Sequence, residues 1–190
     1  MLDQDRGAEV EKYEAAYLED YYRMGDARKA YAEENIASAK DCKTHLDVGC
    51  GRGEMVDFAE SIGLKSQGVE AVDYLADRAN IIHGFAWDLR FDNNSVDLVT
   101  MFDVIEHVLP EDTERTLNEL KRVAKKQLFI TAANYSSFHD GQELHINKRP
   151  YEEWDALFRQ IFHDATVTWL PLKYGIGSET WRIKVCPCQK

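Results

Sequence analysis

The stretch HLDVGCGRGE, His45–Glu54, decides the fold of this chain. Three glycines stand at alternate positions, Gly49, Gly51 and Gly53, directly after a short apolar run. Glycines let the backbone approach a ligand closely and adopt dihedral angles that other residues avoid. A strand, such a loop and then a helix are typical of doubly wound α/β folds, which bind their ligands at the carboxyl edge of the sheet. The stretch therefore predicts a ligand-binding loop in a fold of this class.

Composition and charge narrow the class of protein. The chain has 190 residues, of which 44% are hydrophobic and 30% charged, as expected for one globular domain. No apolar run approaches the roughly 20 residues that a membrane span needs. The acidic start and four cysteines without a Cys-x-x-Cys pair favour a cytoplasmic protein with reduced thiols. The net charge of −11 makes nucleic acid an unfavourable partner, because a polyanion is repelled.

Helical and strand patterns alternate from about residue 43 onward, which predicts a mostly parallel, doubly wound sheet. Residues 1–42 are expected to form an N-terminal helical extension, broken near Arg23–Asp26. The tail segments 165–170 and 180–186 are expected to form an antiparallel hairpin, since no helical pattern separates them. The other expected strands are 44–49, 66–72, 96–102 and 127–133, and the other expected helices are 53–63, 74–81, 110–126 and 151–162.

The residues around the loop indicate what it holds. Glu54 stands where the dinucleotide fingerprint has its last glycine, and the Lys of a P-loop is absent. The loop is therefore unlike those that bind an anionic phosphate. Asp47 adds negative charge at the strand end. Glu70 follows Gly49 by 21 residues, near the end of the second strand, where an acid can accept hydrogen bonds from ribose hydroxyls. A positively charged cofactor with a ribose fits best.

Three segments in order resemble motifs of the class I S-adenosylmethionine-dependent methyltransferases: LDVGCGRG, GVEAVD and DLRFDNNSVDLVTMFDVIEHV. The resemblance implies a Rossmann-like, seven-stranded sheet with a C-terminal antiparallel hairpin, a methyltransferase domain over 43–190, and S-adenosylmethionine as cofactor. It also implies a cofactor-binding set, with Glu70 on the ribose and adenine near Phe85–Asp88. That set is Asp47, Gly49, Cys50, Gly51, Gly53, Glu70, Ala71, Ala86, Trp87, Asp88, Phe102 and Asp103.

One position departs from the family pattern. The family often has an acid directly after the glycine of its third motif, where it accepts a hydrogen bond from the adenine amine, and this chain has Phe85 there. Three replacements are open: a backbone carbonyl, Asp88, or stacking of Phe85 and Trp87 on the adenine.

The candidates for acceptor chemistry lie in FDVIEHV. Asp103, Glu106 and His107 have i, i+3, i+4 spacing, so a helical turn after the fourth strand would place them on one face. His145 follows the fifth strand and is expected to approach the same mouth. We expect His107, His145 and Glu106 to be catalytic, because an imidazole can take a hydroxyl proton near neutral pH. A purely structural role for the Glu-His pair is the alternative.

The same segment, DVIEH, resembles the Glu-x-x-Glu-His segment of ubiquinone-pathway O-methyltransferases and of small-RNA terminal 2′-O-methyltransferases. In both groups it can ligate a divalent metal. Here the first acid is Asp103, one methylene shorter than Glu, so a metal is allowed but not favoured.

The later stretch GQELHINKRPYEEWDALF resembles a segment of glycan and secondary-metabolite methyltransferases, which favours O-methylation of a small-molecule or sugar-like acceptor. The alternatives are a metal-dependent RNA 2′-O-methyltransferase and a non-catalytic cofactor-binding module. Tyr13, Tyr17, Tyr21 and Tyr22 are expected either to form a lid over the acceptor site or to pack on the sheet edge.

Overall fold

A computed structural model describes residues 2–19, 24–170 and 178–185. Tyr21 and Tyr22 lie outside the described residues, as does the link between the two strands of the expected C-terminal hairpin. Within the described residues, no helix combines the length and the apolar character that crossing a membrane requires.

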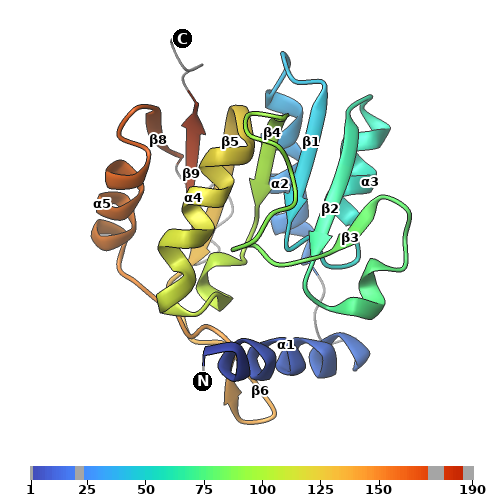
Figure 1. The fold of residues 1–190 in the computed structure, drawn as a ribbon, viewed down its shortest axis with the longest axis vertical. Helices are drawn as coiled ribbons and strands as arrows, with labels where there is room; N and C mark the ends of the chain where they lie inside the picture. Colours follow the sequence, from blue (N-terminus) through green and yellow to red (C-terminus); the bar gives the residue numbers. More distant parts are fainter. Residues whose placement is uncertain (1, 20–23, 171–177, 186–190) are drawn as a thin grey trace.

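A seven-stranded sheet forms the centre of the molecule, in the order β3-β2-β1-β4-β5-β9-β8 (Figure 1). Its first five strands are parallel, while β9 is antiparallel to both β5 and β8. This confirms the mostly parallel sheet with an antiparallel C-terminal pair. The strands are β1 (Thr44–Val48), β2 (Lys65–Glu70), β3 (Ile81–His83), β4 (Val96–Met101), β5 (Ala124–Ala133), β8 (Thr166–Leu170) and β9 (Ser178–Lys184).

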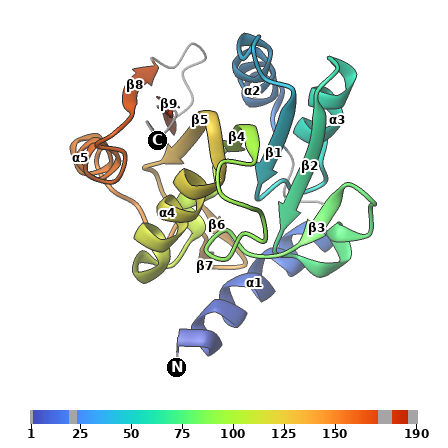
Figure 2. The ribbon, with the colours of Figure 1, turned by 45° about the horizontal axis from the view of Figure 1, so that its top comes forward.

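Helices cover both faces of this sheet, as a doubly wound fold requires (Figure 2). α2 (Asp26–Ser38) and α3 (Glu54–Ser61) lie on one face, and α4 (Thr113–Val123) and α5 (Tyr151–Ile161) on the other. Short 3₁₀ turns connect several elements: η1 (Asp73–Ala76), η2 (Ile105–His107) and η3 (Pro110–Asp112). A small hairpin of β6 (Phe138–His139) and β7 (Gln142–Glu143) follows β5.

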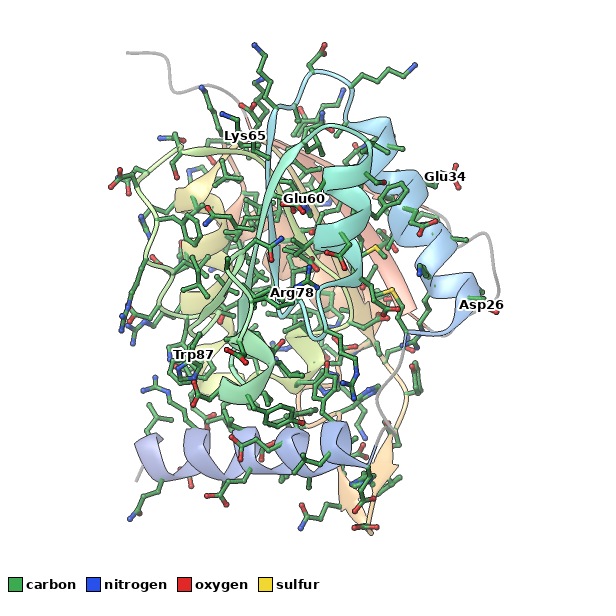
Figure 3. The ribbon with its side chains drawn as sticks, turned by 90° about the vertical axis from the view of Figure 1, so that its right-hand side faces the viewer. Asp26, Glu34, Glu60, Lys65, Arg78 and Trp87 are labelled. Atoms are coloured by element: carbon green, nitrogen blue, oxygen red, sulfur yellow. The ribbon has the colours of Figure 1, made fainter. Side chains whose placement is uncertain are left out.

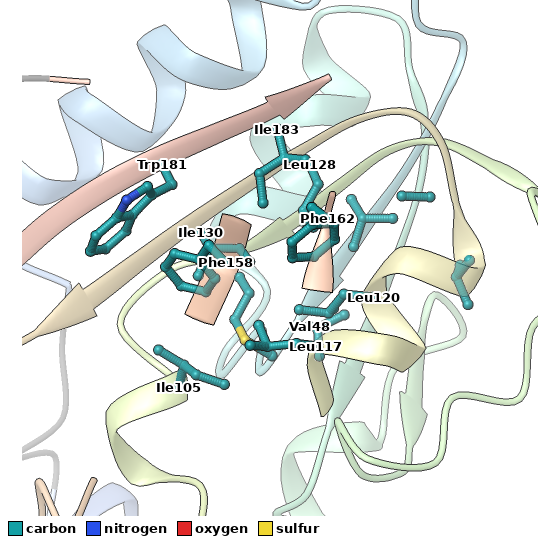
Figure 4. Packing of buried hydrophobic residues seen from close by; sticks show 14 of the residues in the cluster. Val48, Ile105, Leu117, Leu120, Leu128, Ile130, Phe158, Phe162, Trp181 and Ile183 are labelled. Carbon is teal, nitrogen blue, oxygen red and sulfur yellow. The ribbon is translucent and has the colours of Figure 1, made fainter. Parts of the chain in front are cut away.

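The larger hydrophobic core lies between the sheet and the helices α4 and α5 (Figure 4). Leu117 and Leu120 of α4 and Phe158 of α5 are fully buried against the sheet residues Ile130 and Trp181. The i, i+3 spacing of the two leucines puts both on one face of α4, which explains why this segment forms a helix on the sheet.

Two expected elements are wrong in their extent. The helix expected at 74–81 is only the 3₁₀ turn η1, and Ile81–His83 instead forms β3. Parallel pairing of β3 with β2 supplies main-chain hydrogen bonds that a short isolated helix cannot match. The helix expected at 110–126 ends at Val123, because Ala124 already pairs with Val96 of β4 in the sheet.

Helix α1 (Leu2–Leu18) packs on neither face of the sheet and instead crosses beneath the carboxyl ends of the parallel strands (Figure 1). Polar contacts hold it there. Arg6 forms a bidentate ion pair with Asp112, at 2.7 and 2.6 Å. The Tyr13 hydroxyl donates to the backbone oxygen of Leu144 at 2.9 Å. α1 therefore covers the edge of the sheet at which doubly wound folds bind ligands.

Candidate active site

A cavity of about 500 Å³ lies between the carboxyl ends of the strands and α1. Of the residues predicted from the sequence, the following line it: Gly49, Cys50, Gly51, Glu70, Ala71, Ala86, Trp87, Phe102, Asp103 and His107. The following predicted residues do not: Asp47, Gly53, Asp88, Glu106 and His145. The cavity therefore joins the predicted cofactor residues to one of the two predicted catalytic histidines.

The loop after β1 owes its shape to its glycines. Gly49, Gly51 and Gly53 have φ angles of +75°, +52° and +82°, a region that other residues rarely adopt. A Cβ atom on Gly49 would lie 2.4 Å from Val104, and one on Gly51 would lie 2.6 Å from the Tyr17 hydroxyl. The loop thus has no space for side chains, and its backbone directly faces the cavity.

Glu70, at the end of β2, braces this loop. Its carboxylate accepts hydrogen bonds from the backbone N–H groups of Gly51 (2.7 Å), Ala71 (2.9 Å) and Val72 (3.0 Å). Burial raises the pKa of Glu70, and the three N–H groups oppose that rise by stabilising the ionised form. A carboxylate has about four lone-pair sites, so about one site on Oε2 remains for a ligand.

Asp47 lies at the end of β1, below the loop and not in the cavity wall. Its Oδ1 accepts a hydrogen bond of 2.6 Å from the Thr100 hydroxyl. Burial raises the pKa of Asp47 to about 7, the Thr100 hydrogen bond opposes the shift, and the nearby Glu70 adds to it. Asp47 therefore stands at the strand end, as expected, but its side chain is bonded to β4 and does not line the cavity in which the cofactor is expected.

The loop after β3 forms another part of the wall. Gly84, Ala86 and Trp87 line the cavity, whereas Phe85 and Asp88 do not. The Phe85 ring stacks on Trp87, with centroids 4.9 Å apart and planes 9° apart. Oδ1 of Asp88 lies 3.9 Å from a guanidinium nitrogen of Arg115, and both side chains are exposed. The structure thus gives neither Asp88 nor Phe85 a place in the cavity wall.

Asp103 departs from the expected helical face. It has a φ of +53°, and the 3₁₀ turn η2 begins only at Ile105, so Asp103 stands outside the turn that holds Glu106 and His107. Its carboxylate accepts from the Thr131 hydroxyl at 2.9 Å and forms an ion pair of 3.0 Å with Arg28. The expectation that all three residues share one helical face is wrong, because the chain turns left-handed at Asp103.

His107 is held on its Nδ1 side by Tyr13 and by the Leu144 carbonyl. Its Nδ1 lies 2.6 Å from the Tyr13 hydroxyl and 3.0 Å from the Leu144 carbonyl, to which Tyr13 also donates. Burial lowers the pKa of His107 to about 3, so the ring is neutral at pH 7. A proton on Nδ1 can be donated to the Tyr13 oxygen while Tyr13 donates to Leu144, and the backbone of Asp103 also forms a hydrogen bond with the ring.

Glu106 and His145 lie behind His107. The His107 and His145 rings are 4.8 Å apart, so His145 lies beside His107 although it does not line the cavity, and His145 Nδ1 lies 2.7 Å from the Tyr135 carbonyl. Glu106 is fully buried, and within the described part of the chain neither carboxylate oxygen has a hydrogen-bond partner. Burial raises the pKa of Glu106 well above its usual range. Glu106, His107 and His145 each have one potential ligand atom, and these three atoms lie within 4.8 Å of one another, so together they could hold a metal ion.

Several cavity residues were not predicted from the sequence. Arg6, Glu9 and Val10 of α1 line the wall, together with Met24 and Arg28 at the start of the next helix. The signal available was their spacing with Tyr13 and Tyr17, because positions 6, 10, 13 and 17 fall on one face of a helix. That spacing alone does not show which surface the helix covers.

Comparisons with known proteins agree with this geometry. Residues 46–130 match a family model described as "Methyltransferase domain". Norajmaline N-methyltransferase of Rauvolfia serpentina is 28% identical over 128 residues, which are 60% of this chain and 43% of that enzyme. The chain thus spans less than half the length of this curated relative.

Solved structures show the same fold. The 1,6-didemethyltoxoflavin-N1-methyltransferase of Burkholderia thailandensis, with bound 1,6-didemethyltoxoflavin and S-adenosylhomocysteine, has a TM-score of 0.72 and 16% identity, covering 96% of this chain and 89% of that one. A SAM-dependent methyltransferase from Archaeoglobus fulgidus has a TM-score of 0.63 and 18% identity, covering 82% and 92%. Both similarities extend well beyond the segment matched by the family model.

Proposed function

We propose that the chain is a class I S-adenosylmethionine-dependent methyltransferase and that it transfers a methyl group to an oxygen of a small-molecule or sugar-like acceptor. The observation that carries the proposal is the cavity beneath α1, which has the glycine loop and Glu70 in one part of its wall and His107 in another. Donor and acceptor would therefore meet in one enclosed space, as methyl transfer by direct displacement requires.

The residues present fit the cofactor. Gly49, Cys50 and Gly51 line the cavity, where the glycines allow a ligand to approach the backbone closely, and Glu70 Oε2 retains a lone pair for one ribose hydroxyl. Four carboxylates and three guanidinium groups line this space, which leaves a small excess of negative charge for a cationic ligand; they are Glu9, Glu54, Glu70 and Asp103, and Arg6, Arg28 and Arg52. When bound, S-adenosylmethionine supplies a methyl group already activated by its sulfonium. The protein's task is then to position the acceptor and remove its proton.

His107 is the residue we propose for that proton. It lines the cavity, and burial keeps its ring neutral at pH 7, which is the form that can take a proton. The same burial makes the ring a weak base, so the bound cofactor and acceptor must raise its pKa for proton transfer to proceed. Tyr13 is a positioning residue in this scheme, since its hydroxyl holds the Nδ1 side of the ring. An oxygen acceptor needs such a base, which is why the neutral imidazole favours O-methylation in this proposal.

The size of the acceptor follows from α1. Within the extension 1–42, α1 is the part that we propose as a lid, with 43–190 as the methyltransferase domain. A cavity of about 500 Å³ has the size of a typical small-molecule pocket, and the cofactor would occupy much of it. A macromolecular acceptor would require α1 to leave its contacts with Asp112 and Leu144.

Two measurements test the proposal. Calorimetry should show binding of S-adenosylhomocysteine and none of NAD, and the reverse result would contradict the assignment of the cofactor. Mass spectrometry of reactions with small hydroxyl compounds should detect a gain of one methyl group. In the His107→Ala variant, turnover should fall by about 10²–10⁴-fold while the affinity for S-adenosylhomocysteine changes little, because the imidazole acts on the acceptor. Full turnover in that variant would exclude His107 as the base.

A further inference from the structure

Glu9 of α1 carries a buried acceptor that the protein does not satisfy. One carboxylate oxygen, Oε1, accepts a hydrogen bond of 2.5 Å from Lys12. The other, Oε2, is buried, and the described residues offer it no hydrogen-bond partner. Only 16% of the Glu9 side chain is exposed, and the residue lines the cavity. A buried hydrogen-bond acceptor without a donor destabilises the folded state, so a ligand in the cavity that donates a hydrogen bond to Oε2 would be favoured.

The position of Glu9 along α1 identifies the part of the cavity that it faces. Arg6 lies three residues earlier on the same helix face, and its guanidinium stands 5.2 Å from the centre of the Trp87 ring. Trp87 accordingly lies over the N-terminal half of α1 (Figure 3). Tyr13, four residues after Glu9, already contacts His107. Glu9 therefore lies between the Trp87 end of the cavity and His107.

Strand order shows which part of a nucleoside comes to the Trp87 end. The sheet runs β3-β2-β1-β4, with Glu70 at the end of β2 and the residues around Asp103 after β4. A ribose bound at Glu70 carries the sulfonium group on one side and the base on the other. When the sulfonium side points toward the glycine loop and β4, the base points toward β3. The loop after β3 contributes Gly84, Ala86 and Trp87 to the wall, none of which carries a carboxylate.

We propose that Oε2 of Glu9 accepts a hydrogen bond from the exocyclic amine of the cofactor's adenine. The adenine is thus recognised by a residue of α1. The carboxylate nearest in sequence to Trp87 is that of Asp88, and it lies beside Arg115 and outside the cavity.

The adenine amine offers the donor that Oε2 lacks. Ala86 and the part of Trp87 not covered by Phe85 and Arg6 give this end of the wall an apolar surface for the ring itself. This inference rests on the proposed cofactor and adds the residue that selects adenine.

Calorimetry with two ligands tests it: S-adenosylhomocysteine, and the analogue in which purine replaces adenine and only the amine is missing. The wild-type protein should bind S-adenosylhomocysteine about 10- to 100-fold more tightly, the usual effect of a hydrogen bond to a charged group. In Glu9→Met, which keeps the length of the side chain but has no acceptor, this preference should fall below about threefold. The ratio is informative because any loosening of α1 weakens both ligands alike.

Glu11→Met is the matched control, since Glu11 is exposed on the same helix and does not line the cavity, and it should keep the wild-type preference. Equal binding of the two ligands by the wild-type protein would overturn the proposal even if no variant folded. An undiminished preference in Glu9→Met would overturn it as well. A wild-type protein that binds neither ligand would overturn the proposed cofactor, and the role of Glu9 with it.

Discussion

Glu70 has two tasks in the structure, and replacing it by alanine should impair both. The carboxylate accepts three backbone N–H groups, those of Gly51, Ala71 and Val72. Hydrogen bonds to a charged group contribute about 1.5–3 kcal/mol each, but the raised pKa of Glu70 shows that burial of its charge outweighs this gain for the ionised carboxylate. Alanine would instead leave three backbone N–H groups without their acceptor, and a buried donor so left costs about 1–3 kcal/mol. We therefore expect Glu70→Ala to lower the free energy of unfolding by about 2–4 kcal/mol.

Thermal unfolding without ligand measures the first task. At this chain length 1 kcal/mol corresponds to about 2–4 °C, so the melting temperature should fall by roughly 4–16 °C. Asp73→Ala is the control, because Asp73 follows the same strand but its side chain is 82% exposed and braces no part of the glycine loop. It should melt within about 2 °C of the wild-type protein.

The second task is measured by calorimetry with S-adenosylhomocysteine and its 2′-deoxy and 3′-deoxy analogues. Glu70→Ala should bind S-adenosylhomocysteine about 10- to 100-fold more weakly than the wild-type protein. The variant should also no longer distinguish the parent ligand from the analogue that lacks the hydroxyl facing Oε2. Wild-type melting together with wild-type affinity in Glu70→Ala would refute both the bracing of the loop and the contact with the ribose.

Three further predictions concern the acceptor side, the metal and a buried histidine. Tyr13→Phe should lower kcat about tenfold in steady-state assays without changing the affinity for S-adenosylhomocysteine, because only the hydroxyl that holds His107 is lost; unchanged kcat would show that His107 needs no such support. EDTA should leave activity intact, since Asp103, the first acid of the segment that resembles a metal-binding one, is engaged by Arg28 and a threonine hydroxyl; loss of activity that Mg²⁺ restores would contradict this. Burial lowers the pKa of His45 to about 3, whereas in the unfolded chain the pKa is about 6.5. As the pH falls, the unfolded chain therefore binds the proton first. The stability that is present above pH ~6.5 is lost as the pH falls toward 3. Denaturant unfolding of His45→Gln should therefore depend less steeply on pH there, by about 1.4 kcal/mol per pH unit, and an identical slope would count against the shift.

The glycine loop could be predicted from the sequence because its causes are local. Alternate glycines after an apolar run specify left-handed backbone, and Gly49, Gly51 and Gly53 all have positive φ. The strand before them and the helix after them follow from the same short stretch. Asp103 could not be predicted in this way, since its φ of +53° is unusual for a residue with a side chain, and the ion pair with Arg28 that accompanies it spans a long stretch of sequence.

The placement of α1 was also beyond local reasoning. Its anchoring contacts join residues 106 positions apart, Arg6 and Asp112, and 131 positions apart, Tyr13 and Leu144. No periodicity of α1 itself encodes those partners. The tyrosines on one helix face suggested either a lid or packing on the sheet edge, and only the folded arrangement shows that this face borders the cavity.

The way in which α1 is held connects its stability to the contents of the cavity. Of its described residues, none belongs to the hydrophobic clusters of the core, and a helix of 17 residues is only marginally stable by itself. Its order therefore depends on contacts with the site, which include Asp112, Leu144 and the wall of the cavity. A ligand that fills the cavity and binds only the closed arrangement must stabilise α1 by mass action. Because Glu9 and Tyr13 both come from this helix, closure would bring the proposed adenine contact and the support of His107 into place together.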